Sequence, residues 1–154
     1  MQTINSFRGE YYFLSNFYPC KVTVPVDRMK PDGEKITFAN AEAAFHAYKC
    51  EGDAEAMRAF ANLPPNEAKR LGRRVDLDVA AWNGKRIDCM RTVVRAKFTQ
   101  NRDLRHKLAA TDKAMLIEGN TWGDAFWGVS NGGGENRLGQ LLTETRRLIM
   151  QGQL

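Results

Sequence analysis

The first residues with chemical potential lie between positions 40 and 49. Glu42, Phe45 and Lys49 fall at i, i+3 and i+7 of a predicted helix, so they share one face. A carboxylate and an aromatic ring on one face suit a ligand that joins a sugar to a base. Glutamate is also ordinary in a first helical turn, and Phe45 is equally explained as a core residue. The pattern alone favours the structural interpretation.

A second group lies between positions 119 and 128, where two tryptophans, a phenylalanine and Asp124 are interspersed with glycines. Loops that carry aromatic rings and a carboxylate on a rigid scaffold are common binding sites. A packed loop in which Trp122 and Trp127 fill the core explains the same composition. The sequence by itself leaves these two interpretations even.

A third candidate is the glycine run at 132–134, which leads through Glu135 and Asn136 into the last predicted helix. A glycine-rich approach to a helix N-terminus can present backbone N–H groups to an anion. The segment lacks the G-K-[ST] of a P-loop and the G-x-G-x-x-G of a dinucleotide fold. A flexible turn followed by an asparagine cap also explains it.

Other polar residues are weaker candidates. Arg73, Arg74 and Lys97 are available for phosphate contacts, but most such charges form a solvated face. His46 and His106 are interpreted as surface or packed histidines, because no H-x-x-x-H pair is present. We therefore predict no metal site.

The composition of the 154 residues is typical of one globular domain, with 43% hydrophobic and 27% charged residues. A net charge of +5 suits an anionic ligand such as a phosphate, a dinucleotide or a nucleic acid. The three cysteines are widely spaced and form no C-x-x-C pair, which favours a reducing compartment. Without a signal peptide or a membrane-length apolar run, we expect a cytoplasmic protein with a single domain over residues 1–154.

The expected elements are strands at the start and helices afterwards. The turn signal KPDG at 30–33 predicts a hairpin between VTVPV and KITFA. Asn40, Asp53 and Asn136 are predicted helix caps. Helices are expected over 41–50, from 53 to the Pro64–Pro65 pair, over 66–72, from 79 or 84 to 100, over 102–110 and from 137 onward, with a short buried strand at 114–119 and a loop over 119–135. The fold class is therefore α+β, a mainly helical domain with a small antiparallel sheet.

Taken together, these segments resemble the NADAR family, also called YbiA-like, from Phe13 to about Ile149. The order and spacing of the matching pieces carry the resemblance: FLSNFYPC, FANAEAAFHAYK, LGRRVDL, MRTVVRAKFTQN, LIEGN, GDAFWG and NRLGQLLTETR. The resemblance implies an N-glycosidase that needs no metal or redox cofactor. Known members act on phosphoribosylamino-pyrimidine intermediates of riboflavin synthesis or remove ADP-ribose from guanine bases.

The resemblance also assigns residues. The family's catalytic glutamate falls on Glu42, its aspartate on Asp124 and its conserved tryptophan on Trp82. The expected ligand-binding residues are Ser15, Asn16, Phe17, Phe45, Lys49, Arg73, Trp127, Gly128, Asn136, Arg137 and Gly139. The segment 25–36 is longer than the usual family hairpin, which leaves the choice of substrate open.

Cleavage of a ribosyl C–N bond passes through an oxocarbenium-like transition state, which requires a carboxylate and an acid for the departing nitrogen. Glu42 is assigned to water activation or charge stabilisation and Asp124 to the sugar hydroxyls or the leaving group, and these roles can be exchanged. Trp82 and Trp127 are expected to stack on a base or to line the pocket.

Two other functions fit the sequence. The first is a non-catalytic module that binds ADP-ribose or NAD, and the second is a basic nucleic-acid-binding domain. The expected partners are a nucleotide-type small molecule with an ADP-ribose or ribose phosphate moiety and, in addition, ADP-ribosylated nucleic acid, with no membrane partner.

Overall fold

A computed structural model describes residues 2–154. The chain forms two compact units, one made of the residues up to Ser15 together with Arg102–Leu154, the other of Asn16–Asn101. No helix within the described residues combines the length and the apolar composition that crossing a bilayer requires.

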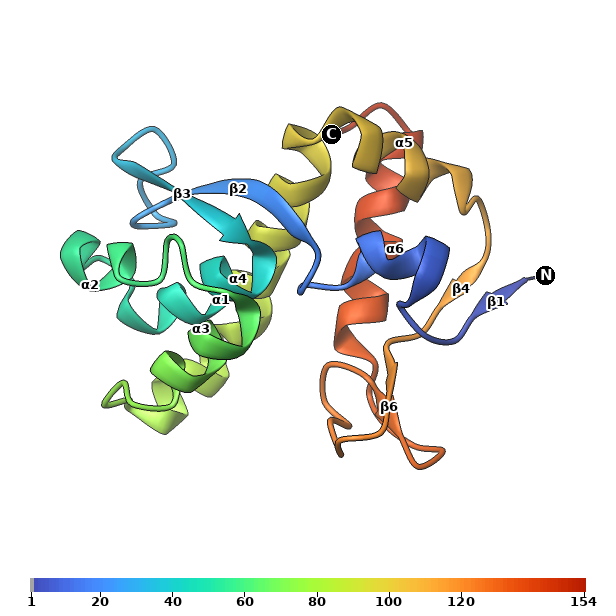
Figure 1. The fold of residues 1–154 in the computed structure, drawn as a ribbon. Coiled ribbons are helices and arrows are strands. Elements are labelled where there is room, and N and C mark those ends of the chain that lie inside the picture. The colour runs from blue at the N-terminus through green and yellow to red at the C-terminus, as the bar shows by residue number, and fades with distance from the viewer. Residues whose placement is uncertain (1) are drawn as a thin grey trace. The chain divides into compact units, whose positions relative to one another are not determined.

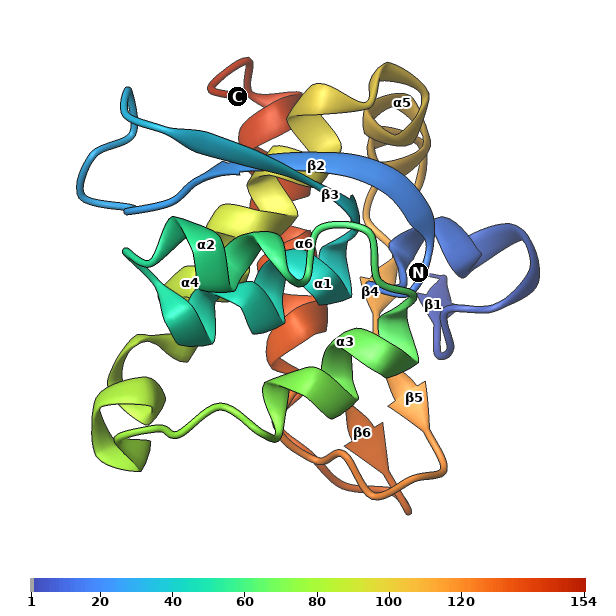
Figure 2. The same cartoon turned by 60° about the vertical axis from the view of Figure 1, so that its left-hand side comes forward.

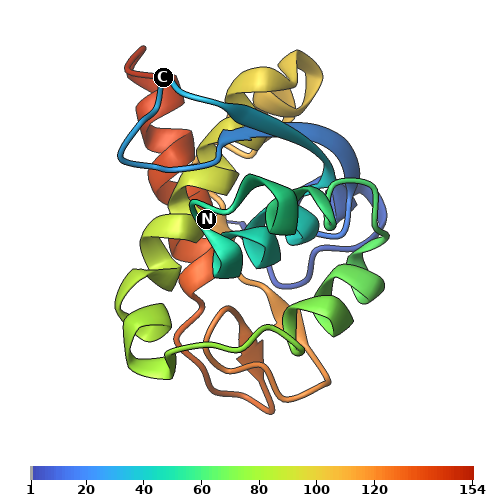
Figure 3. The ribbon, with the colours of Figure 1, turned by 90° about the vertical axis from the view of Figure 1, so that its left-hand side faces the viewer.

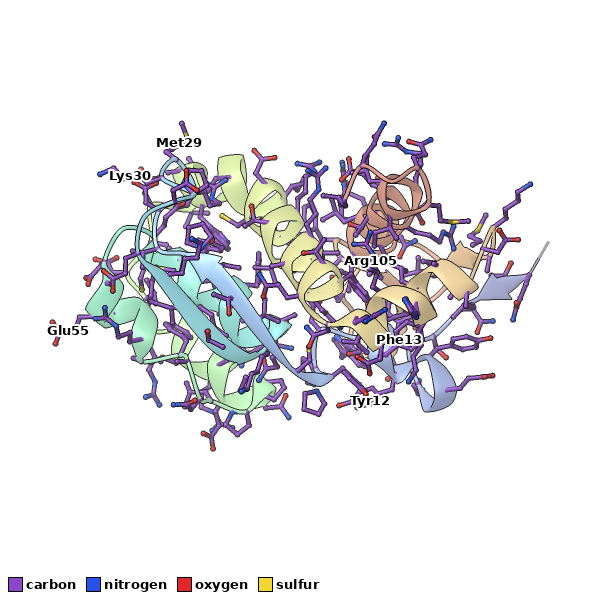
Figure 4. The ribbon with its side chains drawn as sticks, turned by 90° about the horizontal axis from the view of Figure 1, so that it is seen from above. Tyr12, Phe13, Met29, Lys30, Glu55 and Arg105 are labelled. Atoms are coloured by element: carbon purple, nitrogen blue, oxygen red, sulfur yellow. The ribbon has the colours of Figure 1, made fainter. Side chains whose placement is uncertain are left out.

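A β-hairpin opens the unit Asn16–Asn101. Strands β2 (Pro19–Pro25) and β3 (Lys35–Asn40) pair antiparallel, as predicted, and form one curved ribbon above α1 and α2 (Figures 1 and 2). Alternate residues of both strands are buried, namely Val22, Val24, Ile36 and Phe38. The N–H of Gly33 donates to the carbonyl of Lys30 and closes the predicted turn. Met29 and Lys30 lie at the tip of this connection (Figure 4).

The helix α1 (Ala41–Ala47) follows β3 directly. The side chain of Asn40 accepts from the N–H of Ala43 at 2.8 Å, which confirms the predicted cap. The 3₁₀ turn Tyr48–Cys50 extends α1, so the predicted helical stretch is α-helical only in its first part.

The next two helices correct one predicted boundary. The side chain of Asp53 caps α2 (Ala54–Arg58), as expected, but α2 ends well before the two prolines. Pro65 is instead the first residue of α3 (Pro65–Gly72), a position where proline loses no helical hydrogen bond. The proline pair therefore marks the start of one helix and not the end of the other.

The long helix α4 (Val79–Gln100) begins after Asp78, whose side chain accepts from the N–H of Ala81, and packs against β2. One of its charges was predicted wrongly. Lys97, expected on a solvated face, is 1% exposed and lies over the rings of Tyr18 and Phe98. Burial lowers the pKa of its ammonium group to about 8.

The other unit contains short strands and two helices. The strands pair in parallel, β1 (Thr3–Ile4) with β4 (Met115–Leu116) and β5 (Gly119–Asn120) with β6 (Val129–Ser130). A 3₁₀ helix (Gly9–Leu14) follows β1, and α5 (Arg102–Ala110) packs against α6 (Arg137–Met150). Figure 3 shows the orange segment between β5 and α6 doubling back on itself before the last helix begins.

The predicted α+β class is confirmed, and the small antiparallel sheet is the β2–β3 hairpin. The strand expected at 114–119 is shorter than predicted, and the loop expected at 119–135 contains two short strands. The pair β1–β4 joins segments more than a hundred residues apart, and each strand in the parallel pairs has only two residues, too few for an alternating pattern to show in the sequence.

Candidate functional site

Glu42 occupies the first turn of α1, where a backbone hydrogen bond and the cap at Asn40 fix its position. Its N–H donates to the carbonyl of Asn16, and the cap at Asn40 sets the direction in which the helix starts. Its helical neighbours are buried alanines, at positions 41, 43 and 44. The side chain of Glu42 is 12% exposed, so the carboxylate is largely withdrawn from water yet still reaches the surface.

His46 lies one turn further along α1 and contacts this carboxylate. Its Nε2 is 3.3 Å from Oε2 of Glu42, and its own side chain is 13% exposed. From the sequence, His46 is expected to be a packed or surface histidine, because a histidine four residues after a glutamate carries no distinctive pattern.

The same unit holds an aromatic pair, Phe45 and Trp82, with two lysines next to the tryptophan ring. The rings of Phe45 and Trp82 are 5.4 Å apart, and Trp82 is 8% exposed. The ammonium groups of Lys49 and Lys85 lie 5.8 and 5.9 Å from the Trp82 ring. Ammonium groups at such distances interact favourably with an indole ring.

Lys49 contacts the Trp82 ring and also interacts electrostatically with Glu42. Burial lowers the pKa of the Lys49 ammonium, the negative charge of Glu42 raises it, and the positive charge of Arg73 lowers it further; the net direction is downward. The structure thus brings five of the predicted site residues into one neighbourhood: Glu42, Phe45, Lys49, Arg73 and Trp82. Lys85 joins them without having been predicted.

Asn16, in the predicted SNF motif, supports the backbone at the start of α1. Asn16 is 7% exposed, its carbonyl receives the N–H of Glu42, and its side-chain Nδ2 lies 3.3 Å from the sulfur of Met90. Phe17 lies under the ammonium group of Lys69, and Ser15 ends the preceding 3₁₀ helix, where its N–H donates to the carbonyl of Tyr12.

Asp124, in the other unit, organises its own loop. Its Oδ1 accepts from the N–H groups of Phe126 and Trp127 at 3.1 and 2.9 Å. Its N–H and carbonyl both bond the side chain of Asn120. The rings of Phe126 and Trp127 meet edge to face at 4.8 Å, so the half-buried Trp127 packs within the loop.

The N–H groups at the start of α6 were predicted to be available to an anion, but the structure shows them bonded to carbonyls. The N–H groups of residues 135–138 all donate to carbonyls of residues 125–128, so these four donors are engaged by the loop. Asn136 is the N-cap residue of α6, as predicted, but it has φ 52° and its side chain makes no capping hydrogen bond. Its side chain instead donates to the carbonyl of Leu116 and accepts from the N–H of Glu118, which staples α6 to the preceding segment.

Close packing explains Gly128 and Gly139 of the predicted site. A Cβ at Gly128 would collide with Glu118, and one at Gly139 would collide with the carbonyl of Leu116. Arg137 pairs with Glu135 at 3.0 Å on the surface. The role of Gly128, Arg137 and Gly139 in ligand binding stays a prediction.

The NADAR domain profile matches residues 5–150, nearly the whole chain. The chain belongs to the NADAR domain family. The NMR structure of YbiA from Escherichia coli superimposes with a TM-score of 0.76 and 32% identity, covering 99% of this chain and 88% of that one. The predicted family and the YbiA-like fold are confirmed.

The curated relatives of this NADAR chain carry two kinds of name. N-glycosidase YbiA of Escherichia coli is 38% identical over 150 residues, which are 94% of this chain and 85% of the relative. A riboflavin biosynthesis protein of Vibrio vulnificus is 32% identical over 141 residues, but this chain covers only 36% of that longer protein. The predicted enzyme class, hydrolysis of N-glycosyl bonds, is confirmed at the level of the family.

Glu118 of this NADAR chain was not among the predicted site residues. Glu118 is half-buried next to the predicted loop, and its Oε2 accepts from Nδ2 of Asn120 at 3.0 Å. It lies in the LIEGN piece of the sequence, immediately before β5. Within residues 2–154, no three histidine, cysteine, aspartate or glutamate side chains gather as a set of metal ligands.

Proposed function

We propose that this NADAR protein hydrolyses a ribose C1–N bond, either of an ADP-ribosylated guanine base or of a phosphoribosylamino-pyrimidine. The observation that carries the proposal is the nearly buried carboxylate of Glu42 on the same helix as Phe45, whose ring packs against Trp82. Planar rings suit a base or the apolar face of a ribose, and the carboxylate suits the positive charge that develops at C1.

In this scheme Glu42 acts on a water molecule or on the oxocarbenium-like ribose. Water adds to C1 as the C1–N bond breaks, the released nitrogen takes a proton, and the ribose keeps the new hydroxyl. A carboxylate in a site of low polarity interacts more strongly with developing positive charge than one in bulk water. Trp82 lines the site and contacts the ligand.

The cationic groups around Trp82 account for a phosphate. Lys49 lies next to the Trp82 ring, and Arg73 is close enough to lower the pKa of the Lys49 ammonium, so these two are the cations proposed for phosphate. Lys85 also lies next to Trp82 but bonds the carboxylate of Glu51 at 3.0 Å. Both proposed substrates carry phosphate next to the ribose, so one set of cations serves either. The names of the relatives support both the glycosidic bond and the riboflavin-type substrate. ADP-ribosylated nucleic acid is a further proposed partner.

The role proposed for Asp124 is assigned to one of its two carboxylate oxygens. Because Oδ1 is engaged by Phe126 and Trp127, its second oxygen is the one assigned to a sugar hydroxyl or to the leaving group. The chemistry needs water as its only co-substrate, and we propose that it takes place in the cytoplasm without a cofactor.

The test is single-turnover release of the base from each substrate by the wild type and by Glu42→Gln. The variant keeps the volume of the side chain and loses its charge, so turnover should fall about 100-fold or more while ADP-ribose still raises the melting temperature. Glu55→Gln is the matched control, because Glu55 also stands in the first turn of a helix but projects outward from α2 (Figure 4).

The outcomes separate the alternatives. Equal turnover by wild type and Glu42→Gln contradicts the assignment of Glu42. Binding of ADP-ribose without release of base from either substrate favours the non-catalytic binding module. Joint loss of rate and binding in Glu42→Gln assigns this residue to holding the ligand.

A further inference from the structure

We propose that His46 is a positioning residue for Glu42, held as the neutral tautomer whose Nε2–H donates to the carboxylate. The inference rests on the proposed function, because it concerns the same carboxylate. It adds a residue that neither the motif nor the composition singled out, and a glycine, Gly72, that holds it in place.

The contact with Glu42 is built into α1. Positions 42 and 46 are one helical turn apart, so their side chains lie on the same face, and Nε2 is 3.3 Å from Oε2. Both side chains are almost withdrawn from water, with 12% and 13% exposed. The ring of Phe45 meets the imidazole edge at a centroid distance of 5.2 Å and an interplanar angle of 66°. A hydrogen bond in such surroundings orients its partners more firmly than one exposed to water.

The opposite edge of the imidazole faces the end of α3. Gly72 is buried, and a Cβ built there would lie 2.7 Å from Nδ1 of His46 and 3.1 Å from its Cγ. Gly72 is the last residue of α3 and has no positive φ, so it is required for space and not for backbone conformation. The imidazole is therefore confined between α3 and the carboxylate.

The hydrogen bonds determine the tautomer. Nδ1 is buried and has no hydrogen-bond partner within residues 2–154. A proton on Nδ1 would be a buried donor without an acceptor, and removing the proton from Nε2 would leave two acceptors facing each other. The neutral ring with hydrogen on Nε2 satisfies the contact to Glu42 and leaves Nδ1 as an unpaired acceptor, where the other tautomer would leave an unpaired donor and lose the contact to Glu42 as well.

This arrangement gives His46 a specific task. The donated hydrogen bond fixes the rotamer of Glu42 and occupies one carboxylate oxygen, which leaves Oε1 for the water or the ribose. His46 then acts through Glu42 and contacts no substrate atom itself. A misplaced catalytic group costs rate even when the ligand still binds, because the reacting geometry is lost.

The experiment compares three variants. His46→Phe keeps a ring and removes the donor, and Gly72→Ala presses on the ring from its far side; both should lower kcat about 10- to 100-fold with KM and ADP-ribose affinity retained. His46→Gln keeps an N–H donor close to the position of Nε2 and should recover most of kcat. Adding His46→Phe to Glu42→Gln should cause no further loss, because the histidine acts only through the carboxylate.

A spectroscopic measurement tests the tautomer without relying on activity. ¹⁵N-resolved NMR of the wild type should show His46 protonated at Nε2 and unprotonated at Nδ1, with the exposed His106 as the internal reference. A charged ring or an Nδ1–H tautomer overturns the inference. Full kcat in His46→Phe also overturns it, even when Glu42→Gln is inactive, whereas a fully active Glu42→Gln contradicts the proposed role of Glu42.

Discussion

The surroundings of Glu42 and the segment from Leu116 to Gly139 use polar side chains in opposite ways. In the segment, Asp124, Asn120 and Asn136 bond the backbone of their own loop and helix entry. Around Glu42, the carboxylate meets the ring of His46, and the same helix carries Phe45, whose ring packs against Trp82. A motif rich in polar residues and glycine thus serves here to build a loop, whereas the helical face of Glu42 joins its carboxylate to another side chain.

A second carboxylate in the same unit sharpens this contrast. Glu51 accepts from the main chain and the guanidinium of Arg28 and from Lys85 at 2.9–3.1 Å. It ties the long connection of the hairpin to α4. Burial raises the pKa of Glu51, but hydrogen bonds from Arg28 and Lys85 outweigh this and hold it below the ordinary value of 4.5. Glu51 is therefore a structural anchor a few residues from the proposed catalytic Glu42.

The largest expected effect that could break the comparison is that of Asp124→Asn. Asparagine still offers an oxygen to the N–H groups of Phe126 and Trp127, so the loop should keep its conformation. The lost charge should lower turnover about 100-fold if the second oxygen serves the sugar or the leaving group. Single-turnover kinetics and circular dichroism check this, and unchanged kinetics would make Asp124 a loop-building residue only.

Gly139→Ala probes the packing of the NRLG motif. The added methyl group would collide with the carbonyl of Leu116, so the free energy of unfolding should fall by about 1–3 kcal/mol. Gly84→Ala on α4 is the matched control, because a Cβ there meets nothing within 4 Å and should stabilise the helix by about 0.5–1 kcal/mol. Urea denaturation measures both. Equal stability of the two variants would mean that Gly139 is not needed for close packing.

Glu51→Gln tests the structural anchor. Loss of the charge leaves Arg28 and Lys85 without their carboxylate, and the cost should be about 1–3 kcal/mol near neutral pH. Because folding lowers the pKa of Glu51, its stabilising contribution is present above pH 4.5 and is lost as the pH falls through the lower folded value. The difference between wild type and variant should therefore shrink in acid. A difference that stays constant down to low pH would contradict this account.

The smallest expected effect is that of a chelator. The chemistry assigned to Glu42 requires water and no metal ion, so activity should be unchanged in EDTA. Base release measured with and without EDTA checks this. A tenfold or greater loss that a divalent ion restores would show that a metal takes part.

The sequence by itself determined the features that depend on neighbours along the chain. The caps at Asn40 and Asp53, the turn closed by Gly33 and the apolar stripe of α6 arise within a few residues, where local hydrogen bonds and helical spacing decide. The order of its motifs also identified the family, and with it the candidate glutamate.

The tertiary structure alone decided which polar groups are engaged and which face a site. Gly72 reaches His46, the amide of Asn136 reaches Leu116, and the buried Lys97 lies over the ring of Tyr18. Each of these contacts joins different elements. Burial and hydrogen bonding between elements distant in sequence have no periodic signature, because they depend on how the chain folds back on itself.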